Sequence, residues 1–113
     1  PVVGDLSGSH ALRELGRVLD ETGSALTAFY VSNVEFYLWQ SRTLDAWVYN
    51  LGTLPRAPGA VVIRSYFPNF GRGHPSAIPG YYATQSLQPM SSLVQGGFRS
   101  YWDVVTRDVV PLR

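Results

Sequence analysis

The chain of 113 residues contains no cysteine and no lysine. Without cysteine it can form no disulfide framework, no thiolate nucleophile and no cysteine-based metal site. No apolar run approaches the roughly 18 residues that a membrane-spanning helix needs, so we expect no membrane partner. The length and the hydrophobic content of 45% are typical of one soluble globular domain, which we take as residues 1–113.

Charge is also sparse and nearly balanced. Nine arginines oppose eight acidic residues, which leaves a net charge of +1. The arginines do not cluster, whereas non-specific nucleic-acid binding needs several cations on one face, so we expect no nucleic-acid partner. His10 and His74 lie at no metal-ligand spacing, and the G-x-S-x-G motif is absent. The sequence therefore predicts neither a metal site nor a hydrolase triad.

Apolar runs of strand length alternate with segments of helical periodicity. Strands are expected at residues 2–6, 26–31 and 60–65, the last one following a turn at Pro58-Gly59. Helices are expected from Ser9, as N-cap, to Gly23, then at 34–39, from Thr43 to Pro55, and at 91–107 with a kink at Gly96-Gly97.

This order predicts an α/β protein with a three-layer, Rossmann-like sandwich and a short, mainly parallel sheet of about three strands. A sheet this narrow exposes its edges. We therefore expect the chain to be an incomplete part of a larger domain, in which the rest of a longer chain or a homo-oligomer covers the sheet edge. The start at Pro1, inside an expected strand, favours a fragment of a longer protein.

The segment Gly4-Asp5-Leu6-Ser7-Gly8 precedes a helix, where free N–H groups favour an anionic or hydroxylated ligand. Asp5 and Ser7 are therefore candidate ligand-binding residues. The glycine spacing matches neither GxGxxG nor GxxxxGK[ST], so a phosphate loop is not predicted. The alternative is a tight turn without a ligand, in which Asp5 accepts hydrogen bonds from the turn and Ser9 caps the helix.

Polar side chains also follow the two apolar strands. Ser32, Asn33 and Glu35 come after the first of these strands, and Arg64 ends the second. Because ligands bind beyond the carboxyl ends of parallel strands, Asn33 and Glu35 are candidate catalytic residues, and Ser32 and Arg64 are candidate ligand contacts. The alternatives are local: Asn33 caps a helix with Glu35 in its first turn, and Arg64 forms a structural bridge to Glu35 or Asp5.

Residues 66–82 are rich in proline, glycine and aromatic residues and show no period. A stretch of this kind is typical of a functional lid or a disordered segment. Arg72 and His74 would then contact a small-molecule ligand that the lid covers. The alternative is a surface loop whose aromatic side chains pack on the sheet.

The run GDLSGSHALRELGRVLDETGSALTAFYVSNVEFYLWQ, with AVVIRS and SYWDVV after it, resembles a family of uncharacterised bacterial proteins. That family is described as similar to S-adenosylmethionine-dependent methyltransferases. The resemblance implies that this chain is the C-terminal portion of such a protein and that S-adenosylmethionine would bind upstream, in the full-length protein. It transfers a fold more securely than an activity.

Three hypotheses for the function follow. The first is a methyltransferase-like protein in which Asn33 and Glu35 orient or deprotonate a substrate and Arg64 binds its anionic group. The second is a non-catalytic binding or assembly module, in which these three side chains satisfy one another and no open pocket lies at the strand ends. The third and weakest is a nucleotide-binding domain. A cytoplasmic location is favoured, because no leader sequence is present.

Overall fold

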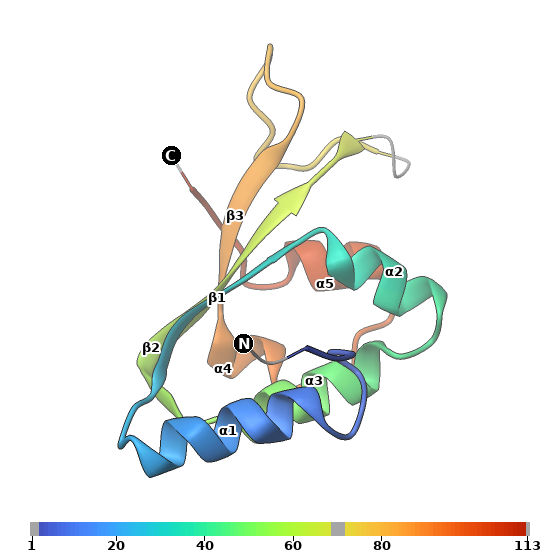
Figure 1. Ribbon diagram of the computed structural model, residues 1–113. Coiled ribbons are helices and arrows are strands. Elements are labelled where there is room, and N and C mark those ends of the chain that lie inside the picture. The colour runs from blue at the N-terminus through green and yellow to red at the C-terminus, as the bar shows by residue number, and fades with distance from the viewer. Residues whose placement is uncertain (1–2, 69–71, 113) are drawn as a thin grey trace.

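The computed structural model describes residues 3–68 and 72–112. It is a mixed α/β protein, as the sequence predicts. The elements follow in the order α1 (Ala11–Glu21), β1 (Leu26–Ser32), α2 (Val34–Gln40), α3 (Leu44–Gly52), β2 (Arg56–Tyr66), β3 (Thr84–Pro89), α4 (Met90–Leu93), α5 (Tyr101–Thr106) and β4 (Val110–Pro111) (Figure 1).

The strands form one open sheet in the order β1-β2-β3-β4. Strands β1 and β2 are parallel, whereas β2 with β3 and β3 with the short β4 are antiparallel. The prediction of a mainly parallel sheet is therefore wrong. It failed because β3, with the sequence TQSLQP, has no β-branched residue beyond its first position and does not show the usual apolar inward face.

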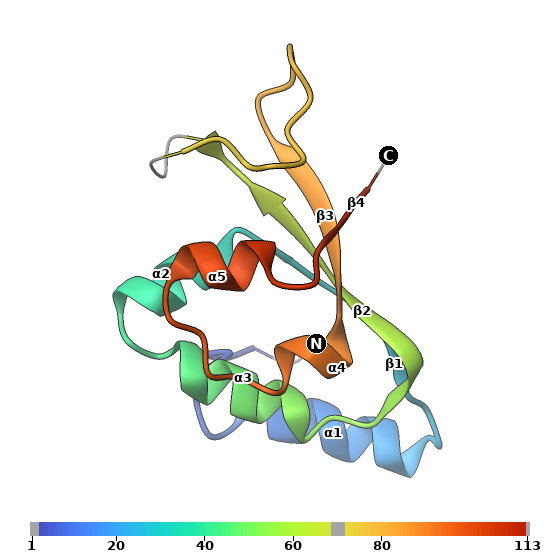
Figure 2. The same ribbon diagram turned by 180° about the vertical axis from the view of Figure 1, so that it is seen from behind.

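All five helices of the described residues lie on one side of the sheet, as the two opposite views show (Figures 1 and 2). The core fills the space between these helices and the sheet. Its centre is formed by large buried side chains from α3, β2, α4 and α5: Trp47, Leu51, Val62, Met90, Leu93 and Val104. Burial alternates along β2, where Ala60, Val62 and Arg64 are buried towards the helices.

Strand β2 begins four residues earlier than predicted. It therefore includes Pro58-Gly59, which were expected to form a turn before the strand. While β1 advances from Leu26 to Ala28, the paired position on β2 advances from Arg56 to Val61. The extra residues form an irregularity in which Gly59 adopts a φ of +77°, a conformation that glycine reaches without strain. Proline and glycine therefore mark a bulge here, and the strand continues through them.

The predicted first strand is also wrong over Val3–Leu6, which form no strand; residues 1–2 lie outside the described residues. This segment lies on α3 instead. The buried Asn50 donates hydrogen bonds from its amide Nδ2 to the carbonyl oxygens of Leu6, at 3.0 Å, and Gly8, at 2.7 Å. These bonds satisfy the carbonyl of Leu6, at the end of the expected strand, and that of Gly8 in the following turn, and they attach the segment to α3.

The end of α1 follows the prediction, but its start does not. Gly23 has a φ of +64°, and the N–H groups of Gly23 and Ser24 donate to the carbonyls of Asp20 and Leu19, which is a Schellman motif. At the other end His10, and not Ser9, is the N-cap, and its side chain forms no capping bond.

The single helix expected over 91–107 is wrong as well. Two short helices, α4 and α5, are separated by seven residues in which Gly96 and Gly97 have φ values of +66° and +68°. Two successive residues in the left-handed region cannot continue an α-helix, so the predicted kink is a complete break. The second helix then restarts at Ser100, whose hydroxyl accepts a hydrogen bond from the N–H of Asp103.

Candidate functional site

Glu35 on α2 and Arg64 on β2 form a bidentate ion pair at the centre of the molecule. Arg64 Nε lies 2.7 Å from Glu35 Oε2, and Arg64 Nη2 lies 3.1 Å from Glu35 Oε1. The two side chains are only 1% and 2% exposed. The sequence left two interpretations of Arg64 open, a structural bridge or a contact to a ligand. The structure shows the bridge, with Glu35 as the partner of Arg64.

Two further buried side chains complete this network. The indole Nε1 of Trp47 donates to Glu35 Oε1 at 3.3 Å, and Arg64 Nη2 donates to Gln88 Oε1 at 2.8 Å. Gln88 in turn donates from Nε2 to the carbonyl oxygen of Arg107, at 2.8 Å. The network therefore ties α2, α3, β2, β3 and the end of α5 together, and its charged atoms are turned away from solvent.

The charges of Glu35 and Arg64 influence the pKa of the nearby Tyr101 hydroxyl. Burial raises the pKa of the Tyr101 hydroxyl well above its ordinary value, and the negative charge of Glu35 raises it further, while Arg64 opposes this shift. Tyr101 therefore stays neutral throughout the physiological range. Its ring stacks at 6.4 Å from that of Tyr66, the last residue of β2.

Ser32 is the last residue of β1 and Asn33 connects β1 to α2, and neither side chain takes part in the hydrogen bonds of the buried pair given above. Asn33 is half-buried at the N-cap position of α2, but its side chain forms no capping bond; its backbone carbonyl accepts a hydrogen bond from Phe36. Ser32 has a φ of +51°. Hydrogen bonds from Ser65, and more weakly from Ser32, lower the pKa of the exposed Tyr30 hydroxyl.

Asp5 and Ser7 form the tight turn that was the alternative to a ligand site. Asp5 Oδ1 accepts hydrogen bonds from the Ser7 N–H, at 2.8 Å, and from the Ser7 hydroxyl, at 2.7 Å. These bonds lower the pKa of Asp5. The turn borders a shallow depression next to Tyr37 and Thr43 of the α2–α3 region, so the structure does not bring Asp5 and Ser7 together with Arg64.

Arg72 and His74 pack against α5. The Arg72 guanidinium lies over the Trp102 ring, 4.2 Å from its centroid. His74 is buried; its Nδ1 accepts from the Ser76 N–H at 3.1 Å, so its Nε2–H donates to the Val105 carbonyl at 2.8 Å. These contacts follow the packed-loop alternative for residues 66–82, of which 69–71 lie outside the described residues.

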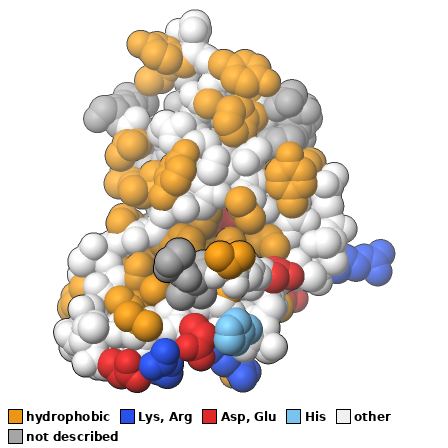
Figure 3. Space-filling model, in the orientation of Figure 1, with side chains coloured by type: hydrophobic (Ala, Val, Ile, Leu, Met, Phe, Trp, Pro, Cys, Tyr) orange, Lys and Arg blue, Asp and Glu red, His pale blue; other side chains and the backbone are white. Residues whose placement is uncertain are grey.

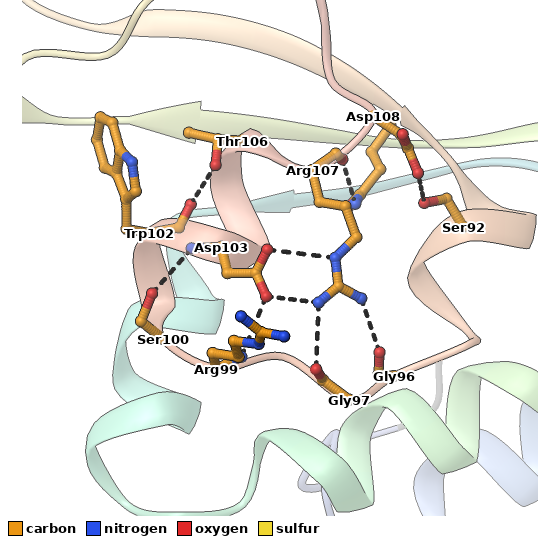
Figure 4. Close-up of polar contacts among 11 residues, drawn as sticks. Ser92, Gly96, Gly97, Arg99, Ser100, Trp102, Asp103, Thr106, Arg107 and Asp108 are labelled. Atoms are coloured by element: carbon orange, nitrogen blue, oxygen red, sulfur yellow. Dashed lines mark hydrogen bonds and ion pairs between the residues drawn. The ribbon is translucent and has the colours of Figure 1, made fainter.

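A second polar cluster, which the sequence analysis did not find, closes the break between α4 and α5 (Figure 4). The Arg107 guanidinium binds the Asp103 carboxylate through two contacts, at 3.2 and 2.5 Å, and donates to the carbonyls of Gly96 and Gly97. It also lies 4.1 Å from the centroid of the Phe98 ring. The spacing of Asp103 and Arg107 by four residues was the available signal.

The Asp103 carboxylate supplies a dependence of stability on pH. Hydrogen bonds from the Arg107 guanidinium, and then from the Arg99 N–H, lower the pKa of Asp103 in the folded chain. A carboxylate whose pKa is lower in the folded than in the unfolded chain stabilises the fold at pH values above its unfolded pKa of about 3.9. This stabilisation disappears as the pH falls through the folded pKa.

We therefore expect the native chain to unfold at a higher urea concentration than Asp103→Asn at pH 6, and this difference to vanish towards pH 2. Urea midpoints of both proteins at a series of pH values test this. Asp20→Asn, at an exposed carboxylate on α1, is the control that should show no such convergence. A difference between native and Asp103→Asn that persists unchanged at pH 2 would contradict the assignment.

Within 3–68 and 72–112, no three histidine, cysteine, aspartate or glutamate side chains gather closely enough to hold a metal ion. None of the helices in this part of the chain has the length and apolarity to cross a membrane.

The fold and the buried network define a small mixed α/β domain with helices on one side of its sheet. The chain belongs to the family described as a domain of unknown function (DUF7790), whose model matches residues 1–100. No curated protein matches the chain. The match covers the whole network except Arg107, which lies beyond residue 100.

Proposed function

We propose that this chain is a binding and assembly module that pairs with a second copy of itself through the uncovered face of its sheet. We call this surface the open face. Its side chains point away from the helices and come from the three longer strands: Ala28, Tyr30, Val61, Ile63, Gln85 and Leu87, together with Ser65, which is buried and lies within hydrogen-bond distance of Tyr30.

The observation that carries the proposal is the chemistry of the open face. It has no charged side chain, and its polar groups form a short chain of hydrogen bonds. Tyr30, which is 61% exposed, places its hydroxyl 3.2 Å from Ser65 Oγ, and Ser65 donates to Gln85 Oε1 at 3.0 Å. Tyrosine enrichment and depletion of charge are typical of the centre of a protein interface.

Between Asp45 and Asp103 the sequence has four arginines and no aspartate or glutamate, and none of these arginines belongs to the open face. In Figure 3 the charged side chains lie along the lower end, around α1, and at the right edge, whereas the upper part, around the outer ends of β2 and β3, shows hydrophobic and uncharged side chains. The open face itself therefore offers no electrostatic attraction to an acidic or basic partner, whereas a second neutral face suits an isologous dimer.

The paired state of the buried charges supports a non-catalytic module. Glu35 and Arg64, the strongest candidates for chemistry, already neutralise each other and are buried, so a substrate would have to break their ion pair to reach them. The predicted three-layer sandwich can be accommodated within this proposal. A partner seated on the open face would supply the third layer that this chain does not form.

The test is the oligomeric state of the chain. We expect sedimentation equilibrium to show a concentration-dependent dimer, and Tyr30→Glu to shift it to monomer, because two carboxylates would be desolvated in the shared interface. Tyr49→Glu, at a 70% exposed position on α3, is the matched control and should leave the dimer intact. A native chain that remains monomeric at several hundred micromolar would overturn the proposal.

The methyltransferase hypothesis is the competing proposal. The observation in its favour is the parallel β1–β2 pair, joined through α2 and α3, with Asn33 at the carboxyl end of β1. Calorimetric titration of the full-length protein with S-adenosylmethionine decides between the two. Binding that is lost in Asn33→Ala but kept in Tyr30→Glu would replace the assembly proposal.

A further inference from the structure

A cleft on the helical side of the molecule is lined by both aromatic and charged side chains. It lies where α2 turns into α3 and has a volume of about 540 Å³. We call it the α2–α3 cleft; its lining residues are Trp39, Gln40, Arg42, Leu44, Asp45 and Phe98. Leu44 is only 3% exposed and continues into the core, so the cleft has an apolar base with polar groups at its rim.

One aromatic wall is held rigidly in place. Phe98 lies in the break between α4 and α5, and the Arg107 guanidinium lies over its ring. Arg107 is itself fixed by Asp103 and by the carbonyls of Gly96 and Gly97 (Figure 4). A ring fixed in this way loses little side-chain entropy when a ligand packs on it.

The cation of the cleft occupies a position that favours glycine. Helix α2 ends in a Schellman motif, in which the Arg42 N–H donates to the carbonyl of Trp39 and the Thr43 N–H to that of Leu38. Arg42 is the left-handed residue of this motif, with a φ of +59°. Helix α1 ends in the same motif with Gly23. An L-residue in this conformation costs about 1 kcal/mol more than glycine.

The backbone therefore gives no reason for arginine at position 42, and neither do side-chain contacts. The guanidinium forms no hydrogen bond or ion pair with any residue of 3–68 or 72–112, including the neighbouring Asp45. Asp45 lies in the first turn of α3, where the helix dipole offsets its negative charge. Arg42 consequently presents an unpaired guanidinium at the rim of an aromatic cleft that Asp45 also borders.

We propose that the α2–α3 cleft binds a planar aromatic carboxylate. The aromatic part of the ligand packs against Trp39 and Phe98, and the carboxylate accepts hydrogen bonds from the Arg42 guanidinium, whose planar fork matches a carboxylate. Because Asp45 borders the same cleft, it repels the ligand and limits the affinity. This site is independent of the open face, which lies on the opposite side of the sheet.

The test titrates the chain with 2-naphthoate, with 2-naphthalenemethanol and 2-naphthylmethylamine as neutral and cationic analogues of the same ring. We expect saturable binding of 2-naphthoate, seen by calorimetry and by shifts of the Trp39 indole NMR signal. Both analogues should bind at least about tenfold more weakly, because they forfeit the charge-assisted hydrogen bonds.

The variant Arg42→Gly separates an effect on ligand binding from an effect on the stability of the fold. Glycine relieves the backbone at this position, so the variant should be as stable as the native chain or more stable, yet bind 2-naphthoate at least about tenfold more weakly. Arg13→Gln removes the same charge from an exposed position on α1 and should leave binding unchanged. Asp45→Asn should bind the ligand equally well or more tightly.

Three results would overturn the site. One is no saturable binding of 2-naphthoate at millimolar concentration. Another is equal affinity for the anionic, neutral and cationic analogues, which would indicate a merely apolar surface. The third is unchanged 2-naphthoate affinity in Arg42→Gly.

Discussion

Replacing Glu35 by glutamine is expected to lower the free energy of unfolding by about 3–5 kcal/mol. The variant keeps the shape of the side chain but removes the negative charge that neutralises Arg64. The Arg64 guanidinium, which is 1% exposed, would then be a buried cation without a counterion. In either orientation the glutamine NH2 group would also face a donor, which is Arg64 Nε in one case and Arg64 Nη2 with Trp47 Nε1 in the other.

Urea unfolding followed by circular dichroism measures this loss. Glu14→Gln is the matched control, because Glu14 also pairs with an arginine, Arg17, but at the surface of α1, where such a pair contributes no more than about 1 kcal/mol. A loss of less than about 1 kcal/mol for Glu35→Gln would show that the buried pair does not stabilise the fold in this way.

A double variant tests whether the stability lost in Glu35→Gln comes from the missing ion pair or from the unpaired charge of Arg64. Glu35→Leu with Arg64→Met removes both charges, and we expect it to recover most of the stability lost in Glu35→Gln, because apolar replacement of a buried pair is often close to neutral. Some buried polar atoms remain unsatisfied in the native chain, since Arg64 Nη1 and the neighbouring Ser86 Oγ have no hydrogen-bond partner among residues 3–68 and 72–112. Those two desolvated groups favour the recovery.

The sequence predicted the parts of the fold that depend on local signals. The apolar run at Leu26–Val31, the helices around Val34 and Leu44, and the left-handed Gly23 all follow from periodicity and end signals in neighbouring residues. The pairing of Glu35 with Arg64 was one of the stated alternatives, because both residues follow strands that were expected to be parallel. Those two strands are indeed parallel neighbours.

The missed parts depend on contacts between distant residues. Strand β3 turns Ser86 and Gln88 towards the helices, and Gln88 is buried there because Arg64 needs an acceptor. A buried glutamine therefore looks like a surface residue in the sequence. Asn50 likewise donates hydrogen bonds to Leu6 and Gly8, which lie 44 and 42 residues away, so the segment expected as the first strand contacts α3. No local pattern contains either partner.

Trp47→Ala is expected to be as destabilising as the loss of Glu35, at about 3–5 kcal/mol. Trp47 is completely buried, and its ring meets that of Phe29 edge-on with the centroids 5.1 Å apart. Alanine would leave a cavity between α3 and β1 and would remove the indole N–H that donates to Glu35. The variant would therefore lose core packing, and the buried Glu35 carboxylate would lose a hydrogen-bond donor.

Chemical denaturation at low temperature measures this change, with Tyr49→Ala on the same helix as the control. Tyr49 is 70% exposed, so its removal should change stability by no more than about 0.5 kcal/mol. If Trp47→Ala does not fold, Trp47→Phe keeps most of the volume and loses the hydrogen bond. The double variant Trp47→Phe with Glu35→Gln should then lose less stability than the sum of the two single losses, because both changes remove the same contact. Strict additivity would mean that the indole contributes only packing.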